Sequence, residues 1–271
     1  MIIAAFIVTC GIAAFICVAH FVGFPKVVGD KKYNYTIKDI YVEHDDIRLY
    51  GKTLVPDGDG SWPVIIYAHG AESSHASDMT TLKSLAMSGI ACVTFDFYGW
   101  STKSTGPQKG DWFKGQERGA DDRYEKQVLE QVKDLNAVIE YVKNAEFADK
   151  NNIYLLGSSM GGATVAACSV EHSDDIKAIV LQYPAINLVP TAMISGGEYD
   201  VNQYTSDVLL LQGTADTIVP IEMSDSLVSY YNELRPDHCS YVIYEGQPHV
   251  FTGKYKVKAA GEILKFINAL K

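Results

Sequence analysis

One stretch of the chain decides its fold: residues 153–168 read IYLLGSSMGGATVAAC. An apolar run of strand length leads into a glycine-rich turn of the form G-x-S-x-G, and a segment of small residues with helical character follows. Such a strand, turn and helix would lift the hydroxyl of Ser159 above the end of a sheet, and side chains at the flanking glycine positions would collide with the turn. We therefore expect Ser159 to be a nucleophile. The alternative is a glycine-rich turn capped by serines.

Alternating strand and helix patterns surround this stretch. Apolar runs typical of buried parallel strands occur at 64–68, 91–97, 153–156, 179–181, 208–211 and 241–244. Apolar residues at steps of three and four predict amphipathic helices at 128–142 and 257–270, with shorter helical patterns at 82–87 and 221–234. Segments 33–43 and 47–55, separated by Asp45-Asp46, predict an N-terminal antiparallel hairpin. We expect residues 25–271 to form one α/β domain with a mostly parallel, doubly wound sheet.

Two later loops contain the partners that a serine nucleophile needs. A serine hydroxyl requires a base that takes its proton, and an imidazole base requires a carboxylate that fixes its tautomer. Asp216 lies in the loop after the strand at 208–211, and His249 lies in the loop after the strand at 241–244. Because chemistry in such sheets sits at the carboxyl ends of the strands, we expect His249 to be the base and Asp216 to orient it. The alternative for Asp216 is a helix N-cap, and the two roles are compatible.

Two backbone amides are needed for the negative charge that develops on a substrate oxygen. We expect one from Met160, just after the nucleophile, and one from Ala71, in the loop after the strand at 64–68. The N-terminus of the helix after Ser159 would also favour negative charge at this point. The neighbouring His69 is expected to brace the loop rather than to titrate in catalysis.

Composition excludes several classes of protein. The 271 residues are 47% hydrophobic and 21% charged, which excludes a disordered, collagen-like or coiled-coil chain. Acidic residues number 33 against 23 Lys and Arg, and the net charge of -10 would repel nucleic-acid phosphates. We therefore expect no nucleic-acid partner. The three cysteines beyond residue 24 are an odd number, which argues against a disulfide framework.

The first 24 residues contain no Asp, Glu, Lys or Arg. A helix of this length, at about 1.5 Å per residue, reaches roughly 36 Å, enough to cross a hydrocarbon core. We expect residues 1–24 to be a single-pass membrane anchor, either a transmembrane helix or an uncleaved signal; a cleaved signal and a secreted protein are the alternative. Lys26, Lys31 and Lys32 follow the span, so the positive-inside rule favours a cytoplasmic domain.

Several short motifs occur in the order that one enzyme superfamily shows. They are His69-Gly70, FDFYG at 95–99, GSSMGG at 157–162, GTAD at 213–216 and Pro248-His249. Over residues 40–271 the chain resembles the serine-hydrolase branch of the α/β-hydrolases. It resembles more closely the bacterial cinnamoyl (feruloyl) esterases and lipases grouped with the S33 serine aminopeptidases. This resemblance implies a hydrolase that acts on small-molecule carboxylic esters without a metal ion or other cofactor.

Two departures from the family pattern concern the substrate pocket. The cinnamoyl esterases carry a long lid after the sixth strand, whereas only 23 residues separate Tyr183 from Asp207 here, which predicts a short or absent lid. The long loop after Gly99 contains three large aromatic residues that could wall the acyl pocket instead, namely Trp100, Trp112 and Phe113. A solvated surface loop is the alternative.

The expected reaction is acyl transfer through a covalent intermediate on Ser159, with His249 moving the proton and Asp216 fixing the imidazole. Water then releases the acid. The same residues would also cleave amides or thioesters, so a peptidase or a thioesterase is the first alternative. The second alternative is a membrane-anchored binding protein that keeps the fold without catalysis.

Overall fold

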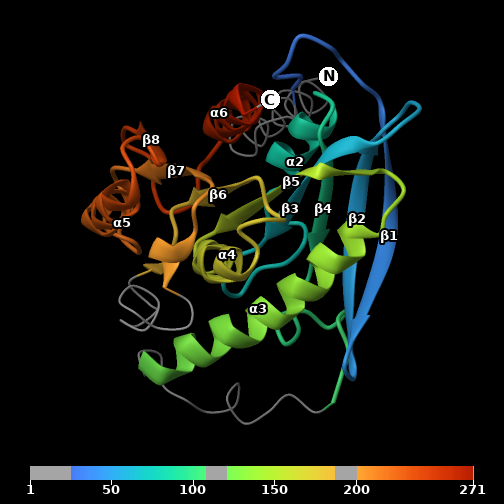
Figure 1. Ribbon diagram of the computed structural model, residues 1–271, viewed down its shortest axis with the longest axis horizontal. Helices are drawn as coiled ribbons and strands as arrows, with labels where there is room; N and C mark the ends of the chain where they lie inside the picture. Colours follow the sequence, from blue (N-terminus) through green and yellow to red (C-terminus); the bar gives the residue numbers. More distant parts are fainter. Residues whose placement is uncertain (1–25, 108–120, 187–199, 271) are drawn as a thin grey trace, which may run out of the picture.

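The computed structural model describes residues 26–107, 121–186 and 200–270, with the backbone alone at 121–125 and 202. These residues form an eight-stranded sheet in the order β1-β2-β4-β3-β5-β6-β7-β8 (Figure 1). β1 pairs with β2, and β2 with β4, in the antiparallel sense, whereas all other neighbours are parallel. The mostly parallel α/β sheet with an N-terminal hairpin is therefore confirmed. The strands are β1 (Tyr35–His44), β2 (Ile47–Pro56), β3 (Trp62–Ala68), β4 (Ala91–Phe95), β5 (Ala148–Ser158), β6 (Ala178–Gln182), β7 (Asp207–Gly213) and β8 (Cys239–Tyr244).

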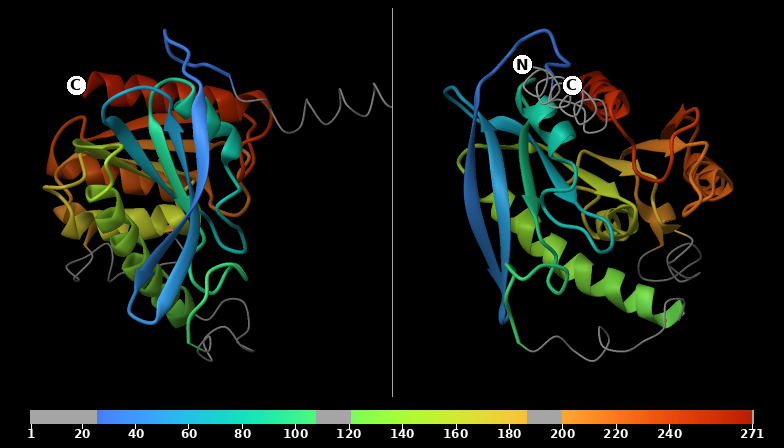
Figure 2. Two further views of the ribbon diagram at one scale, coloured as in Figure 1. Left: turned by 90° about the vertical axis from the view of Figure 1, so that its right-hand side faces the viewer. Right: turned by 180° about the vertical axis from the view of Figure 1, so that it is seen from behind.

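Helices cover both faces of this sheet (Figures 1 and 2). Successive side chains of a strand point to opposite faces, and in β3 Val64 and Ile66 join one apolar core while Ile65 and Tyr67 join the other. The first core contains residues of α3, α4 and α5, and the second contains residues of α2 and α6. The sheet is thus doubly wound, as the sequence predicts. The helices are α2 (Met79–Ala86), α3 (Asp121–Lys143), α4 (Met160–Glu171), α5 (Ile221–Leu234) and α6 (Lys254–Ala269), with a short 3-10 helix η4 (Val201–Gln203).

Two strands differ in length from their apolar runs. The run at 91–97 predicts a longer strand than β4, which ends at Phe95, because the Phe97 amide donates a hydrogen bond to Nε2 of His69 instead of to a neighbouring strand. β5 begins at Ala148, before its apolar run, and pairs there with Trp62 of β3. The polar side chains at 149–152 conceal this extension from a hydrophobicity pattern.

The start of the described chain is hydrogen-bonded to α2 and to the turn that follows it. The amide of Lys26 donates to Ser84 Oγ at 3.1 Å, and the amide of Val28 donates to Ser88 Oγ at 3.0 Å.

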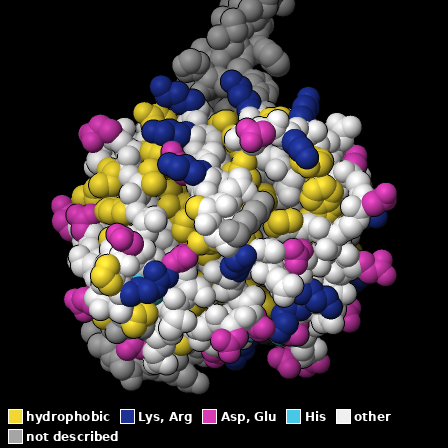
Figure 3. Space-filling view, turned by 45° about the horizontal axis from the view of Figure 1, so that its top comes forward, with side chains coloured by type: hydrophobic (Ala, Val, Ile, Leu, Met, Phe, Trp, Pro, Cys, Tyr) yellow, Lys and Arg dark blue, Asp and Glu magenta, His cyan; other side chains and the backbone are white. Residues whose placement is uncertain are grey.

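The face of the molecule that carries α2 and α6 bears several Lys and Arg side chains (Figure 3). Within the described ranges no helix is both long and apolar enough to span a bilayer. The anchor expected at 1–24, and residues 187–199 of the segment where a lid would lie, fall outside the described residues.

Candidate active site

The turn between β5 and α4 holds Ser159 in a backbone conformation that residues with side chains rarely adopt. Its φ of 54° and ψ of -121° place it at the sharp bend from strand to helix. A Cβ atom at Gly157 would lie 2.3 Å from the carbonyl oxygen of Gly161, and one at Gly161 would lie 2.2 Å from that of Ala68. Neither position has room for a side chain. The strand, turn and helix that the motif predicts are present, and Ser159 lies at the carboxyl end of the sheet.

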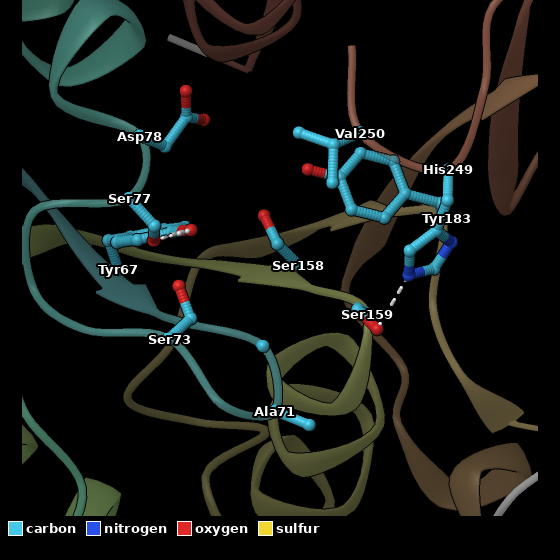
Figure 4. Close-up of a pocket in the computed structure, with 11 residues that line it drawn as sticks. Tyr67, Ala71, Ser73, Ser77, Asp78, Ser158, Ser159, Tyr183, His249 and Val250 are labelled. Carbon is cyan, nitrogen blue, oxygen red and sulfur yellow. Dashed lines mark hydrogen bonds between the residues drawn. The ribbon is translucent and has the colours of Figure 1, made fainter. Parts of the chain in front are cut away.

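The imidazole of His249 lies between Ser159 and Asp216. Its Nε2 is 2.9 Å from Ser159 Oγ (Figure 4). Its Nδ1 is 2.8 Å from Asp216 Oδ2. The loops after β7 and β8 touch backbone to backbone, since a Cβ atom at Gly213 would lie 2.2 Å from the carbonyl oxygen of Gln247. A carboxylate only accepts hydrogen bonds, so Nδ1 carries the proton and Nε2 is left to accept from the serine hydroxyl. In this arrangement the imidazole can take the proton of Ser159.

Both carboxylate oxygens of Asp216 accept hydrogen bonds. Oδ1 accepts hydrogen bonds from the amides of Ile218 and Val219 at 2.9 and 2.8 Å, and Oδ2 accepts from Gln212 Nε2 at 3.1 Å as well as from His249. Burial alone would raise the pKa of Asp216, but the hydrogen bonds from His249 and the two amides outweigh burial and hold that pKa below its ordinary value. Asp216 therefore stays charged at neutral pH and fixes the tautomer of His249.

Two amides beside Ser159 can receive an oxyanion. Met160 is the first residue of α4, so its amide has no acceptor within the helix, and Ala71 lies in the turn after β3. In the described part of the chain no backbone acceptor engages either amide. The turn after β3 passes close to the serine, since a Cβ atom at Gly70 would lie 3.1 Å from Cβ of Ser159. Both donors that the sequence indicates thus belong to segments next to Ser159.

His69 holds this turn as a neutral ring. Its Nδ1 donates to the carbonyl oxygen of Gly70 at 2.7 Å, and its Nε2 accepts from the amide of Phe97 at 3.2 Å. Protonation of Nε2 would place two donors against each other. Complete burial lowers the pKa of His69 to about 4, so the ring stays neutral at physiological pH. The geometry fits the bracing role that the sequence indicates.

A cavity of about 130 Å³ opens beside Ser159. Its wall is mostly apolar but includes several hydroxyl groups and one carboxylate, and Figure 4 shows Asp78 across the cavity from Ser159. A cavity of about 150 Å³ is enough to hold benzene, so this one takes a small group of a substrate. Besides Ser159 and His249, its lining includes Tyr67, Ser73, Ser77, Asp78, Ser158 and Tyr183.

Tyr183 is a site residue that motif reasoning does not identify. It directly follows β6, its φ is 38°, and its ring centroid lies 4.9 Å from that of His249. Phe251 packs edge-on against Tyr183, at 5.0 Å between centroids. Tyr183 thus places an aromatic ring against the His249 imidazole. The position of Tyr183 at the carboxyl end of a strand is the signal that could have indicated it.

Of the three aromatic residues expected to wall the acyl pocket, Trp100 is the one that lies among the described residues. Trp100 is half-buried and packs against the apolar core of the face that carries α3 and α4. It is not among the residues that line the cavity. Trp112 and Phe113 lie outside the described residues. The aromatic part of the lining comes instead from Tyr67 and Tyr183.

The fold and the environment of Ser159 define an α/β-hydrolase, and comparison with known families assigns the chain to one of them. The family described as serine aminopeptidase, S33, matches residues 62–199, half of the chain. The chain belongs to this family and is a serine hydrolase of the α/β-hydrolase superfamily. The resemblance noted from the motifs is thereby confirmed.

Individual relatives are distant. The uncharacterized protein YfhR of Salmonella typhimurium is 23% identical over 228 residues, covering 75% of this chain and 70% of YfhR. The solved structure of Est1E from Butyrivibrio proteoclasticus with ferulic acid bound has a TM-score of 0.66 at 21% identity, covering 85% of this chain and 99% of Est1E. Dienelactone hydrolase from Anabaena variabilis has a TM-score of 0.63 at 17% identity, covering 86% of this chain and 96% of its own. At these identities the two structures show the shared fold alone.

Proposed function

We propose that this protein hydrolyses small carboxylic esters through an acyl-enzyme intermediate on Ser159. The observation that carries the proposal is the continuous hydrogen-bonded chain from Ser159 Oγ through the His249 ring to Asp216, with contacts of 2.9 and 2.8 Å. As Oγ attacks the ester carbonyl, Nε2 of His249 takes its proton, and Asp216 stabilises the imidazolium that forms. The hydrogen bonds that keep Asp216 charged therefore serve the proton transfer.

The tetrahedral intermediate places a negative charge on the former carbonyl oxygen. The amides of Ala71 and Met160 would donate to this oxygen, and the N-terminal end of α4 adds a favourable dipole. His249 then gives its proton to the leaving alcohol, and the carbonyl re-forms as the acyl-enzyme. Water attacks the acyl-enzyme in the same way, with His249 taking its proton and returning it to Oγ as the acid departs.

Two observations support an ester as the substrate. A structural neighbour, Est1E, is described with ferulic acid bound, and another is named as a dienelactone hydrolase; a lactone is an internal ester. The cavity of about 130 Å³ supports a short substituent next to the scissile bond. Because the family is named for serine aminopeptidases, cleavage of an aminoacyl amide is the rival activity that an experiment has to separate.

The test is hydrolysis of p-nitrophenyl butyrate by the full chain in mild detergent. We expect turnover that Ser159→Ala lowers by about 10⁴-fold or more, because the covalent step is lost. Ser226→Ala is the matched control, since this exposed hydroxyl donates to the carbonyl oxygen of Glu222 in its own helix. Undiminished turnover by Ser159→Ala would contradict the proposal. In a parallel panel, an aminoacyl anilide or a thioester cleaved faster than the ester would assign a peptidase or a thioesterase.

A further inference from the structure

The cavity beside Ser159 carries more hydrogen-bonding groups than ester hydrolysis requires. Tyr67 Oη lies 2.9 Å from Ser77 Oγ, and Ser158 Oγ donates to Gln182 Oε1 at 3.1 Å. In Figure 4 the hydroxyl groups of Tyr67, Ser73 and Ser158 point toward the space that the labelled residues enclose. Each hydroxyl can donate and accept. The wall therefore offers hydrogen bonds to a polar group of a substrate.

Asp78 is the one carboxylate among the described residues that line this cavity, and the proposed mechanism does not use it. It precedes α2 and is 5% exposed. Its Oδ1 accepts from Thr81 Oγ1 at 2.8 Å and lies 3.9 Å from Lys256 Nζ. A buried carboxylate is costly unless donors satisfy both of its oxygens.

The groups around Asp78 do not fully offset the cost of burying its charge. The side chain of Gln182 is 1% exposed, its Oε1 accepts from Ser158, and the side chain also lowers the pKa of Asp78 through a hydrogen bond. Burial nevertheless raises the pKa of Asp78 to about 6, because the opposing effects of Lys256, Thr81 and Gln182 do not cancel that rise. A further donor would stabilise the carboxylate.

The charge around Asp78 favours a hydroxyl group over an ammonium group as this donor. Lys256 Nζ already lies 3.9 Å from Oδ1, so a second cation in the cavity would be repelled. An ammonium group only donates, whereas a hydroxyl group donates to a carboxylate and accepts from neighbouring hydroxyls such as that of Ser73. A neutral group that both donates and accepts hydrogen bonds therefore fits the charge around Asp78 and the neighbouring hydroxyl groups.

We propose that the cavity binds a hydroxyl group carried by the substrate, with Asp78 as its acceptor. The proposal rests on the proposed ester hydrolysis and names its substrate class: short esters hydroxylated on the acyl or on the alcohol part. Asp78 is then the residue that selects among substrates, while Ser159 and His249 perform the reaction.

The test compares substrates that differ by one group, using the full chain in mild detergent. Ethyl 3-hydroxybutyrate is paired with ethyl 3-methylbutyrate for the acyl part, and 2-hydroxyethyl butyrate with propyl butyrate for the alcohol part. In each pair a hydroxyl replaces a methyl of similar size. We expect kcat/KM to favour the hydroxylated ester by about tenfold or more in one pair, because a site built to bond a hydroxyl rejects its apolar analogue. The pair that responds identifies the part of the substrate in the cavity.

The ratio of kcat/KM within a pair of esters separates the effect of Asp78 on substrate preference from the effects of the catalytic residues. Proton transfers at His249 affect both esters of a pair and cancel in the ratio. The titratable and charged groups around Asp78 are Lys256 of α6, Tyr67 of β3, Tyr183 after β6 and His249 after β8. Burial raises the pKa of both tyrosines, so neither titrates near pH 6. The preference for the hydroxylated ester should therefore fall as pH drops through about 6 and Asp78 becomes protonated.

Variants of two residues sharpen the test. Asp78→Asn keeps the size of the side chain, and asparagine is also favourable at a helix N-cap. This variant should bring the ratio of kcat/KM between the two esters of a pair to within about twofold of one. Lys256→Met keeps the carboxylate but removes the cation, so the preference should persist while its midpoint moves to higher pH. Asp174→Asn, at an exposed carboxylate, is the matched control and should change neither. If Asp78→Asn fails to fold, Asp78→Ser and the pH profile of the unsubstituted protein carry the same test.

Three results would overturn the proposal. They are ratios within about twofold in both pairs, an unchanged ratio in a folded Asp78→Asn variant, or a preference for ethyl 3-aminobutyrate over ethyl 3-hydroxybutyrate. Each can occur while ethyl 3-methylbutyrate or propyl butyrate is still cleaved in a manner that depends on Ser159. In contrast, failure to cleave any of these esters would reject the proposed function itself.

Discussion

Replacing His69 by glutamine should remove an acid-sensitive part of this protein's stability. In the folded protein the ring is neutral, because it donates to the Gly70 carbonyl, accepts from the Phe97 amide and is completely buried. Its pKa is about 4, against an ordinary value of 6.5. Between these two pH values the unfolded chain binds a proton at His69 and the folded chain does not. The free energy of unfolding therefore falls as pH drops from 6.5 toward 4 and levels off below it.

The size of the effect follows from the same two values. Between about pH 7.5 and about pH 4.5 the His69 proton should lower the free energy of unfolding by about 2.5 kcal/mol. Asp78, whose pKa burial raises to about 6, acts in the opposite direction over a similar range, so the profile of the unsubstituted protein does not isolate His69. The difference between that protein and His69→Gln does, because every other titration is common to both.

Urea unfolding followed by tryptophan fluorescence, in mild detergent at each pH, measures this difference. The advantage of the unsubstituted protein over His69→Gln should shrink by about 2.5 kcal/mol on acidification, with an unchanged dependence on urea concentration. If the difference in the free energy of unfolding between the two proteins stays constant to within about 0.5 kcal/mol, His69 is not the neutral ring with two hydrogen bonds that the structure shows.

Three further changes have defined outcomes. Asp216→Asn should lower kcat by about 10⁴-fold without unfolding the protein, because Nδ1 of His249 loses the acceptor that fixes its tautomer. Circular dichroism checks the fold, and p-nitrophenyl butyrate turnover checks kcat. A loss of kcat below tenfold would contradict this prediction. Gly161→Ala should abolish turnover and lower the melting temperature, because its Cβ would lie 2.2 Å from the carbonyl oxygen of Ala68; Gly261→Ala, whose Cβ meets nothing within 4 Å in α6, should instead raise stability by about 0.5–1 kcal/mol. Residues 1–24 should keep the chain in the membrane pellet after alkaline carbonate extraction, and deletion of these residues should release it; a full chain in the supernatant would contradict the anchor.

The arrangement of Ser159, Asp216 and His249 could be predicted because each residue lies in the turn or loop that follows an apolar run of strand length. Parallel strands place their carboxyl ends at one edge, so three positions far apart in the sequence were expected to meet there. The structure brings them to within 2.9 Å of their partners. The glycines at 157 and 161 were informative for a related reason, since the close backbone approach they allow leaves no room for a side chain.

The substrate cavity could not be predicted in the same way. Its wall combines Tyr67 from β3, Asp78 from the start of α2, Ser158 from β5 and Tyr183 after β6, and no spacing in the sequence relates these positions. Large aromatic residues in the sequence point instead to Trp100, Trp112 and Phe113. The structure places Trp100 against an apolar core, and the other two lie outside the described residues. The polar groups of this wall come together through the packing of side chains across elements, and periodicity contains no information on that packing.

Covalent labelling of the full chain with a fluorophosphonate, followed by peptide mass spectrometry, tests the central claim most directly. The geometry predicts an adduct on Ser159 that is absent in Ser159→Ala and forms at least about a hundredfold more slowly in His249→Gln, because the imidazole no longer takes the hydroxyl proton. An unlabelled Ser159, under conditions that label a known serine hydrolase, would contradict the claim. So would a labelling rate that His249→Gln leaves unchanged.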